Sequence, residues 1–193
     1  LVRSEIGHDA IDEVEYAEAK LAHADWKFGF TVNKKINSKK LIQDIAKSTK
    51  CFPKFKNDGT FGFNVIKNSY TVSDIVDEVE TGDYNNAHLI KESEVISYSF
   101  KKTKSEQIYQ KVGVHYNKDY AQDSYLKITP PLDMSASFSP PFVAIGDYYG
   151  LGDTKPYLEF ESDYIRDDET AHKLREFLFN NYKNDHLIFN LKL

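Results

Sequence analysis

The sequence predicts an α+β fold with mostly antiparallel strands, in a barrel-like or sandwich arrangement, and three to four short helices. Three observations lead to this fold class. Several short segments alternate apolar and polar residues, as half-buried strands do. Other segments place apolar residues three and four positions apart, as amphipathic helices do. The pair Asp58-Gly59 stands between two apolar runs, which is typical of a hairpin.

The composition is that of a folded protein, with 40% hydrophobic and 28% charged residues among 193. The formal net charge is -5, whereas a general nucleic-acid binder is usually basic, so we expect no general nucleic-acid binding. No apolar run approaches the ~20 residues of a membrane span. Cys51 is the single cysteine, which rules out an intrachain disulfide. Because the chain begins with Leu1 and its one methionine is Met134, we expect a fragment or a processed piece.

The first 80 residues divide into a lead segment, residues 1–25, and a strand–helix–hairpin unit, residues 26–80. A short acidic helix is expected within residues 9–25, because apolar residues recur there at helical spacing. These apolar residues are Val14, Ala17, Leu21 and Ala24. Residues 26–32 alternate large aromatic residues with smaller ones, which predicts a strand.

A second helix is expected over residues 39–49, with Ser38 as its N-cap. Its apolar face consists of Leu41, Ile42, Ile45 and Ala46. Asp58-Gly59 then predicts a hairpin between strands at residues 51–55 and 60–66, because both turn residues tolerate positive φ. Apolar spacing over residues 71–79 predicts another short helix.

Residues 81–193 are predicted to form a β-rich domain. Strict alternation over residues 94–101 and 109–117 predicts two strands, and the polar link at 102–106 would close a hairpin between them. In the second strand the apolar face consists of Val112, Val114 and Tyr116.

A long irregular loop is predicted for residues 119–156, where prolines and glycines recur. This loop also carries many large apolar side chains, which usually mark a contact surface. We therefore predict an interface formed by Phe138, Phe142, Val143, Ile145, Tyr148 and Tyr149. The alternative is that these residues pack on the sheet of their own chain.

The C-terminal end predicts a strand at residues 157–161, a helix and a final strand at residues 186–193. Asp167 is the expected N-cap of the helix, and the acidic residues that follow it suit the helix dipole. The helical stripe is expected to face the core against the final strand. It consists of Ala171, Leu174, Phe177, Leu178 and Tyr182.

The sequence shows no pattern typical of catalysis or of metal or cofactor binding. The six histidines are not spaced as zinc ligands. The acidic run over residues 159–169 lacks the spacing of a calcium loop, and the glycine-rich residues 146–152 lack the Lys and helix of a phosphate loop. Cys51 has no histidine near it in the sequence. We therefore expect no enzyme, no required metal and no cofactor.

Two other classes of function stay open at this stage. Aromatic residues can line the sugar site of a carbohydrate- or receptor-binding module. The candidates for such a site are Tyr148, Tyr149, Tyr157 and Tyr164. A cell-wall hydrolase would need two opposed carboxylates in a cleft, which a sequence does not display.

Three stretches of the sequence resemble bacteriophage tail hub and tail-tip proteins. They are the helix and Asp58-Gly59 hairpin within residues 39–66, the stretch from Val112 to Ala121 with Asp123-Ser124-Tyr125, and the stretch from Tyr164 to Ala171 with Leu174, Phe177-Leu178 and residues 187–193. The resemblance covers residues 26–193. It implies barrel-like domains and a ring-forming structural component of the virion tail, usually a homotrimer, that contacts other tail proteins and is assembled in the host cytoplasm. It implies no catalytic residues.

Overall fold

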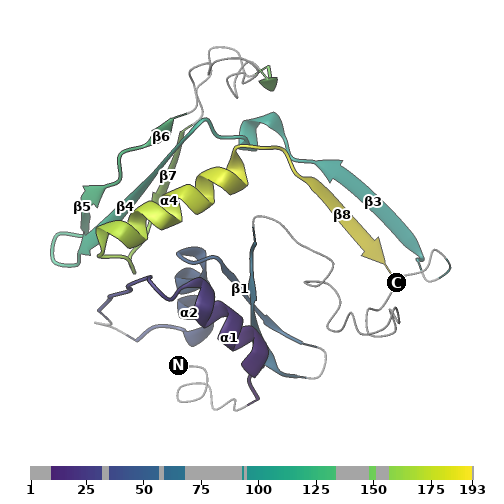
Figure 1. Cartoon of the computed structure of the whole chain (residues 1–193), viewed down its shortest axis with the longest axis horizontal. Coiled ribbons are helices and arrows are strands. Elements are labelled where there is room, and N and C mark those ends of the chain that lie inside the picture. Colours follow the sequence, from purple (N-terminus) through teal and green to yellow (C-terminus); the bar gives the residue numbers. More distant parts are fainter. Residues whose placement is uncertain are drawn as a thin grey trace.

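The computed structural model describes residues 10–31, 35–56, 59–67, 93, 95–133, 148–150 and 157–192. Within these residues three α-helices combine with antiparallel strand pairs and one mixed sheet, so the predicted α+β class is confirmed (Figure 1). The predicted helix over residues 71–79 lies outside the described residues. None of the helices in the described part combines the length and the hydrophobicity that a membrane crossing requires.

Two helices and a hairpin make up the N-terminal part: α1 (Glu13–Ala22), α2 (Ser38–Lys47), β1 (Cys51–Phe55) and β2 (Phe61–Val65). Both helices begin after a capping side chain. Asp12 accepts the N–H of Glu15 ahead of α1, and Asn37 accepts the N–H of Lys40 ahead of α2. The prediction of Ser38 as the cap is wrong, because Asn37 has the extended backbone of a cap whereas Ser38 is already helical.

The predicted hairpin is confirmed, with Cys51 opposite Val65 and Phe55 opposite Phe61. Gly59 lies in its turn with a φ of +84°, a left-handed value that glycine adopts without strain. α1 contacts β2 and α2 contacts β1, so the two helices pack on the hairpin. The buried apolar residues of this part are Leu41, Ala46, Phe61 and Val65.

Ion pairs attach α1 to the hairpin. Glu15 lies 3.2 Å from the Lys54 ammonium group and 3.1 Å from that of Lys56. The apolar stripe seen in the sequence faces solvent instead, since Val14 is 73% and Leu21 80% exposed. The helix is therefore where the spacing predicts it, but it buries none of its own residues.

The strand predicted over residues 26–32 is wrong. Phe28 makes a single bridge with Ile165, and the N–H of Lys27 donates to the hydroxyl of Thr170 over 2.9 Å. The backbone groups of this segment are therefore bonded to the C-terminal part of the chain and not to a neighbouring strand. The segment joins the two parts of the molecule.

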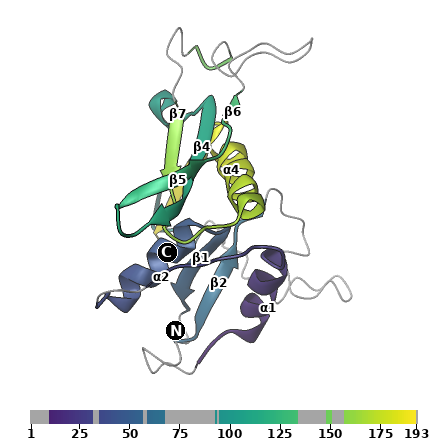
Figure 2. The ribbon, with the colours of Figure 1, turned by 90° about the vertical axis from the view of Figure 1, so that its left-hand side faces the viewer.

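A second contact between the two parts is made by buried hydroxyl groups. The Oγ atoms of Ser48 and Ser162 lie 2.8 Å apart, and both serines are almost completely buried. An ion pair of 3.5 Å between Lys27 and Asp167 lies at the surface nearby. In Figures 1 and 2 the N-terminal helices and hairpin lie along one side of the C-terminal part.

The C-terminal part is built on four strands: β4 (Lys111–Asp119), β5 (Ser124–Ile128), β6 (Leu132–Asp133) and β7 (Tyr157–Glu161). β4 lies at the centre of this sheet. β5 and β6 run antiparallel along one edge of β4, and β7 runs parallel along the other edge. This sheet is therefore mixed, but four of the five strand pairings among the described residues are antiparallel, as predicted.

The segment 119–156, predicted to be an irregular loop, contains β5 and β6. A bulge separates the two strands, because residues 129–131 stand opposite only two residues of β4. Thr129 secures the bulge: its N–H donates to the Val114 carbonyl and its hydroxyl accepts the Val114 N–H, both over 2.9 Å. The two prolines after Thr129 lack an N–H and fall in this gap, which explains why they are tolerated.

α4 (Asp168–Tyr182) covers one face of the sheet and completes the main core (Figure 2). Asp167 caps it as predicted, accepting the N–H of Thr170. Apart from Tyr182, which is 37% exposed, the apolar stripe of α4 is buried, and it packs against β4. Its predicted packing on the final strand is wrong, because that strand pairs with β3 outside the sheet. The core consists of Ile108, Val112, Val114, Tyr116, Ile165, Ala171, Leu174, Phe177, Leu178 and Phe179.

A separate two-stranded ribbon is formed by β3 (Ser97–Lys102) and β8 (Leu187–Lys192) (Figure 1). The predicted hairpin between β3 and β4 is therefore wrong. The polar link forms a short 3-10 helix, Ser105–Gln107, and the chain then buries Ile108 in the core of the sheet. Thr103 exchanges hydrogen bonds with His186, which fixes the end of the ribbon nearest the core.

Candidate assembly interface

The interface predicted in segment 119–156 is described in part. Phe138, Phe142, Val143 and Ile145 lie outside the described residues. Tyr148 is 73% exposed, whereas Tyr149 packs against the core. The Tyr149 hydroxyl donates to the Asp185 carboxylate over 3.2 Å and accepts the Asp185 N–H over 3.1 Å. Tyr149 is therefore held by contacts within its own chain. The interface in this segment stays a prediction.

The four tyrosines considered for a sugar site have different surroundings. Tyr148 and Tyr149 touch each other edge to face, with ring centres 4.8 Å apart. The Tyr157 side chain lies over Gly113 of β4, in the space that a side chain at position 113 would occupy. Tyr164 contacts the Phe30 ring at 5.3 Å. These contacts do not gather the four rings into one binding wall.

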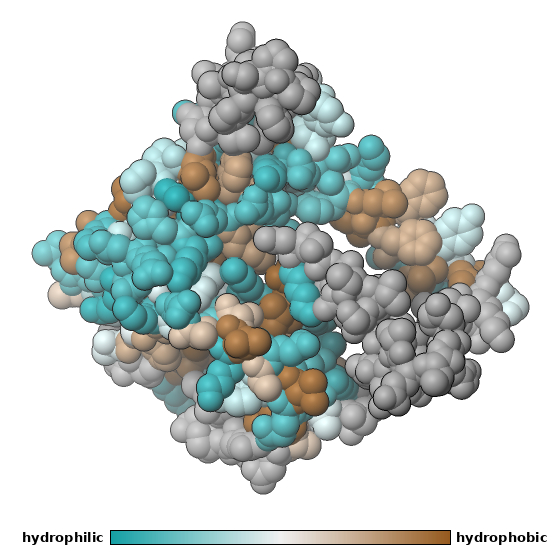
Figure 3. Space-filling view, in the orientation of Figure 1, coloured by the Kyte–Doolittle hydropathy of each residue, from teal (hydrophilic) through white to brown (hydrophobic). Residues whose placement is uncertain are grey.

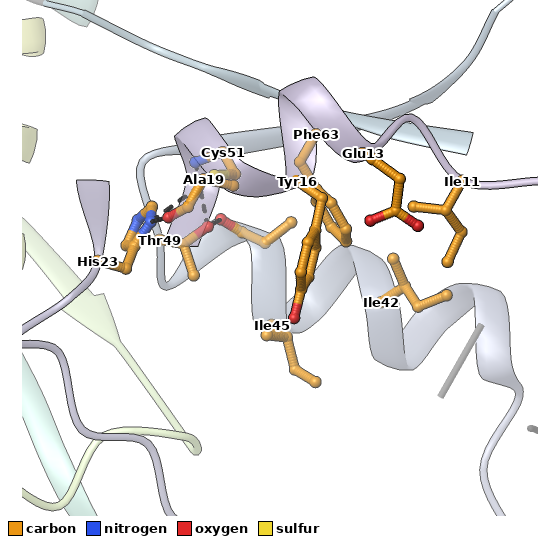
Figure 4. A pocket seen from close by; sticks show the side chains of 11 residues that line it. Ile11, Glu13, Tyr16, Ala19, His23, Ile42, Ile45, Thr49, Cys51 and Phe63 are labelled. Carbon is orange, nitrogen blue, oxygen red and sulfur yellow. Dashed lines mark hydrogen bonds between the residues drawn. The ribbon is translucent and has the colours of Figure 1, made fainter. Parts of the chain in front are cut away.

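A cavity of about 450 Å³ lies between α1, α2 and the hairpin (Figure 4). Its walls are mostly apolar, and Tyr16 of α1 extends across it toward Ile45 of α2 in Figure 4. The lining residues are Ile11, Glu13, Tyr16, Ala19, His23, Ile42, Ile45, Ala46, Thr49, Cys51 and Phe63. The apolar face predicted for the second helix thus divides between the buried core and this cavity.

At one end of the cavity the structure brings together Cys51 and His23, which sequence spacing does not indicate. The Cys51 Sγ lies 3.9 Å from Nδ1 of His23. That nitrogen is 2.7 Å from the Ala19 carbonyl, so it is the protonated one, and Nε2 accepts the N–H of Lys50 over 3.0 Å. Both ring nitrogens are therefore engaged, and neither is available to take a proton from the thiol.

Burial keeps both groups uncharged. It raises the pKa of Cys51 to about 11, an effect that a hydrogen bond with Thr49 opposes. It also lowers the pKa of His23; the Ala19 carbonyl opposes this shift and the nearby Lys50 charge adds to it. A nucleophilic cysteine needs the opposite arrangement, a lowered pKa beside a base. As placed here, the pair is a packed thiol and a neutral imidazole.

The acidic run near the C-terminus is engaged in structural contacts. Asp163 accepts a 2.6 Å hydrogen bond from Tyr125 and pairs with Lys118 at 3.3 Å. Asp167 caps α4, and Asp168 pairs with Lys127 at 2.7 Å. In the part of the chain that the structure describes, no group of three or more His, Cys, Asp or Glu side chains is placed to hold a metal ion.

The β3–β8 ribbon sorts its side chains by face. Directly opposed residues of an antiparallel pair point to the same side of the sheet. The pairs Tyr98–Leu191 and Phe100–Phe189 therefore share one side with Leu187. We call these five residues the ribbon face: Tyr98, Phe100, Leu187, Phe189 and Leu191. The other side is mainly polar, and its pairs are Ser97–Lys192, Ser99–Asn190 and Lys101–Ile188.

The ribbon face is open to solvent. Every residue of both strands is exposed, including Tyr98 at 67%, Phe100 at 64% and Phe189 at 53%. Figure 3 shows apolar side chains gathered over these two strands. An isolated two-stranded ribbon is marginally stable in water, and a contiguous exposed apolar patch usually marks a contact site. The sequence displays the alternation in each strand, but not that the two strands pair with each other.

Comparison with known proteins does not identify a family for this chain. No model of a protein family matches the chain, and no curated protein matches it.

Proposed function

We propose that the chain is a structural component of a bacteriophage tail hub or tail tip, which acts through assembly interfaces. The observation that carries the proposal is the exposed apolar ribbon face, whose aromatic and leucine side chains suit a protein contact. The tail context is supported by the resemblance of three stretches to tail hub and tail-tip proteins. By that resemblance the protein is a homotrimer in the virion tail, beside other tail proteins, after assembly in the host cytoplasm.

A structural role also suits the chemistry of the described residues. The one thiol is held protonated, and the histidine beside it has both nitrogens bonded. The four candidate tyrosines of a carbohydrate- or receptor-binding module have separate surroundings. In the assembled particle, the ribbon would gain the second layer of a barrel-like or sandwich arrangement, which it lacks among the described residues.

The proposal is tested on tailed phage particles whose genome encodes this chain. Antibodies raised against the purified chain, detected with gold in the electron microscope, are expected to label the tip of the tail. Antibodies depleted on the purified chain serve as the control and should not label. Label that is absent from both intact particles and isolated tails would contradict the proposal, as would binding of the purified chain to a defined glycan with the particles unlabelled.

A further inference from the structure

We propose that the ribbon face of one copy packs face to face on the same ribbon face of a second copy, across a two-fold axis. This inference rests on the proposed function, since it names the partner of the assembly contact. A face that meets itself must be free of repelling charge. Lys102 is the one charged side chain that shares this side of the ribbon, and it pairs with Asp185 at 3.2 Å.

The remaining charges of the ribbon lie on its other side. Lys101 and Lys192 point away from the ribbon face, because they alternate with its residues along the strands. Face-to-face packing therefore leaves their ammonium groups in water. Asp185 lies just before β8 and can neutralise the charge of Lys102. Its hydrogen bond with Lys102 lowers the pKa of the Asp185 carboxyl group.

The area of the ribbon face reaches the lower part of the range for specific interfaces. Its five residues expose on the order of 440–730 Å², taking roughly 150–250 Å² for a fully exposed large side chain. Complete burial in two copies would remove up to about 900–1,450 Å² from water, against roughly 1,200–2,000 Å² for specific interfaces. Two of the rings already stack within one copy, with Tyr98 and Phe189 centres 6.1 Å apart.

The shape of the contact follows from sheet packing. Two ribbons that stack through their apolar sides form a two-layer sandwich about 10 Å thick. Such a contact joins copies in pairs, so a homotrimer would use other surfaces and the ribbons would pair two such rings. Addition of a partner strand along the outer edge of β3 or β8 is the competing arrangement.

The first test measures particle mass by sedimentation velocity. The double variant Phe100→Ser with Phe189→Ser should halve the mass of the wild-type particle, from dimer to monomer or from hexamer to trimer. Ile188→Ser is the matched control, because it removes an apolar side chain from the other side of the same ribbon. It should leave the mass unchanged. Far-ultraviolet circular dichroism checks that each variant is folded, and Phe100→Ser alone serves if the double variant is not.

The second test locates the contact by cross-linking with a short bis-maleimide in a Cys51→Ala background, because sheets about 10 Å apart are too distant for a direct disulfide. Phe100→Cys should cross-link two copies, whereas Ser99→Cys, on the other side of β3, should not. A wild-type chain that stays monomeric, an unchanged mass in the ribbon-face variant, or equal cross-linking at both positions would overturn the inference. If the chain is monomeric but antibodies against it still label the tail tip, the pairing of ribbons fails and the proposed function stands. If the ribbons pair but the tail tip is not labelled, the proposed function fails and the pairing stands.

Discussion

At the scale of single residues, burial decides what the cavity between α1 and α2 can do. Cys51 and His23 touch, yet the thiol keeps its proton because the charged form would lose its hydration. Cys51 also donates its N–H to the Thr49 hydroxyl over 3.1 Å, which fixes the start of β1. The Cys51 and His23 side chains therefore act as packing groups at the C-terminal end of α1.

The raised pKa of Cys51 predicts slow thiol chemistry in the native protein. At about pH 8, reaction with iodoacetamide should be much slower in buffer than in concentrated urea, since the thiolate is the reacting form. Between the ordinary pKa of 9.0 and about 11, the unfolded chain loses a proton that the folded chain keeps. The free energy of unfolding should therefore fall over that range by more in the wild type than in Cys51→Ala. Equal alkylation rates in both solvents would contradict the prediction.

Leu174 is the largest fully buried side chain of α4. It is fully buried against the sheet, so Leu174→Ala should lower the free energy of unfolding by about 2–5 kcal/mol. Leu126→Ala is the control, because Leu126 is 60% exposed and should change it by less than about 0.5 kcal/mol. Urea denaturation followed by circular dichroism measures both. Similar losses in the two variants would mean that α4 does not pack as described.

At the scale of elements, α4 is held at its first turn by side chains from both parts of the chain. The Asp167 carboxylate accepts the Thr170 N–H and hydroxyl and lies 3.5 Å from Lys27. The Thr170 hydroxyl in turn accepts the Lys27 N–H. The capping residue thus fixes the start of the helix and the segment that leads to it from α1.

Asp167→Ala should destabilise the protein by about 0.5–2 kcal/mol, the usual cost of losing an N-cap. The Thr170 hydroxyl also loses its acceptor, which places the expected value toward the upper end. Glu169→Ala is the control: it removes a first-turn carboxylate whose contact, with Lys173, lies at the surface. Denaturant midpoints of the two variants provide the comparison, and a larger effect at Glu169 would refute the capping role.

At the scale of the whole molecule, the two parts are joined by polar contacts and by the packing of Trp26 and Phe30 on the C-terminal part. Ser48 and Ser162 bond to each other where both are shielded from water. A buried hydroxyl that loses its partner costs more than one removed together with that partner. The serine pair therefore reports whether the two parts stay docked in solution.

A double-mutant cycle on Ser48→Ala and Ser162→Ala tests this docking. Each single variant should lower the free energy of unfolding by about 1–3 kcal/mol, because it leaves one buried hydroxyl without this bond. The double variant should lose less than the sum of the two, with a coupling of at least about 0.5 kcal/mol. Additive effects would mean that the parts separate in solution. Thr103→Ala, at the ribbon, provides an uncoupled reference with either serine.

Local signals in the sequence predict local structure well here. Asp58-Gly59 predicts the β1–β2 hairpin, and Asp167 predicts the start of α4, because each acts on its immediate neighbours. Pairings between distant segments depend on how the whole chain packs, which a short stretch of sequence does not reveal. The partner of β3 is an example, as is the bulge at Thr129, where two prolines read as an irregular loop.

The candidate site was harder to predict for the same reason. Alternation in residues 94–101 and 186–193 reads as two half-buried strands, with Phe189 and Leu191 on one face of the final strand, which is expected to pack against the C-terminal helix. Their exposure results from pairing with β3 outside the sheet, a long-range property. The contact of Cys51 with His23 likewise joins positions that are well separated in the sequence.

The pairing of β3 with β8 also sets the order in which the protein can be completed during synthesis. The whole sheet and α4 are encoded between these two strands, so roughly 85 residues are translated after β3 before β8 emerges, which takes several seconds at about 5–20 residues per second. Throughout that interval the apolar residues of β3 have no partner strand. We therefore expect chaperones to bind the nascent chain at Tyr98 and Phe100, and slower translation of β8 to increase misfolding more than slower translation of β1.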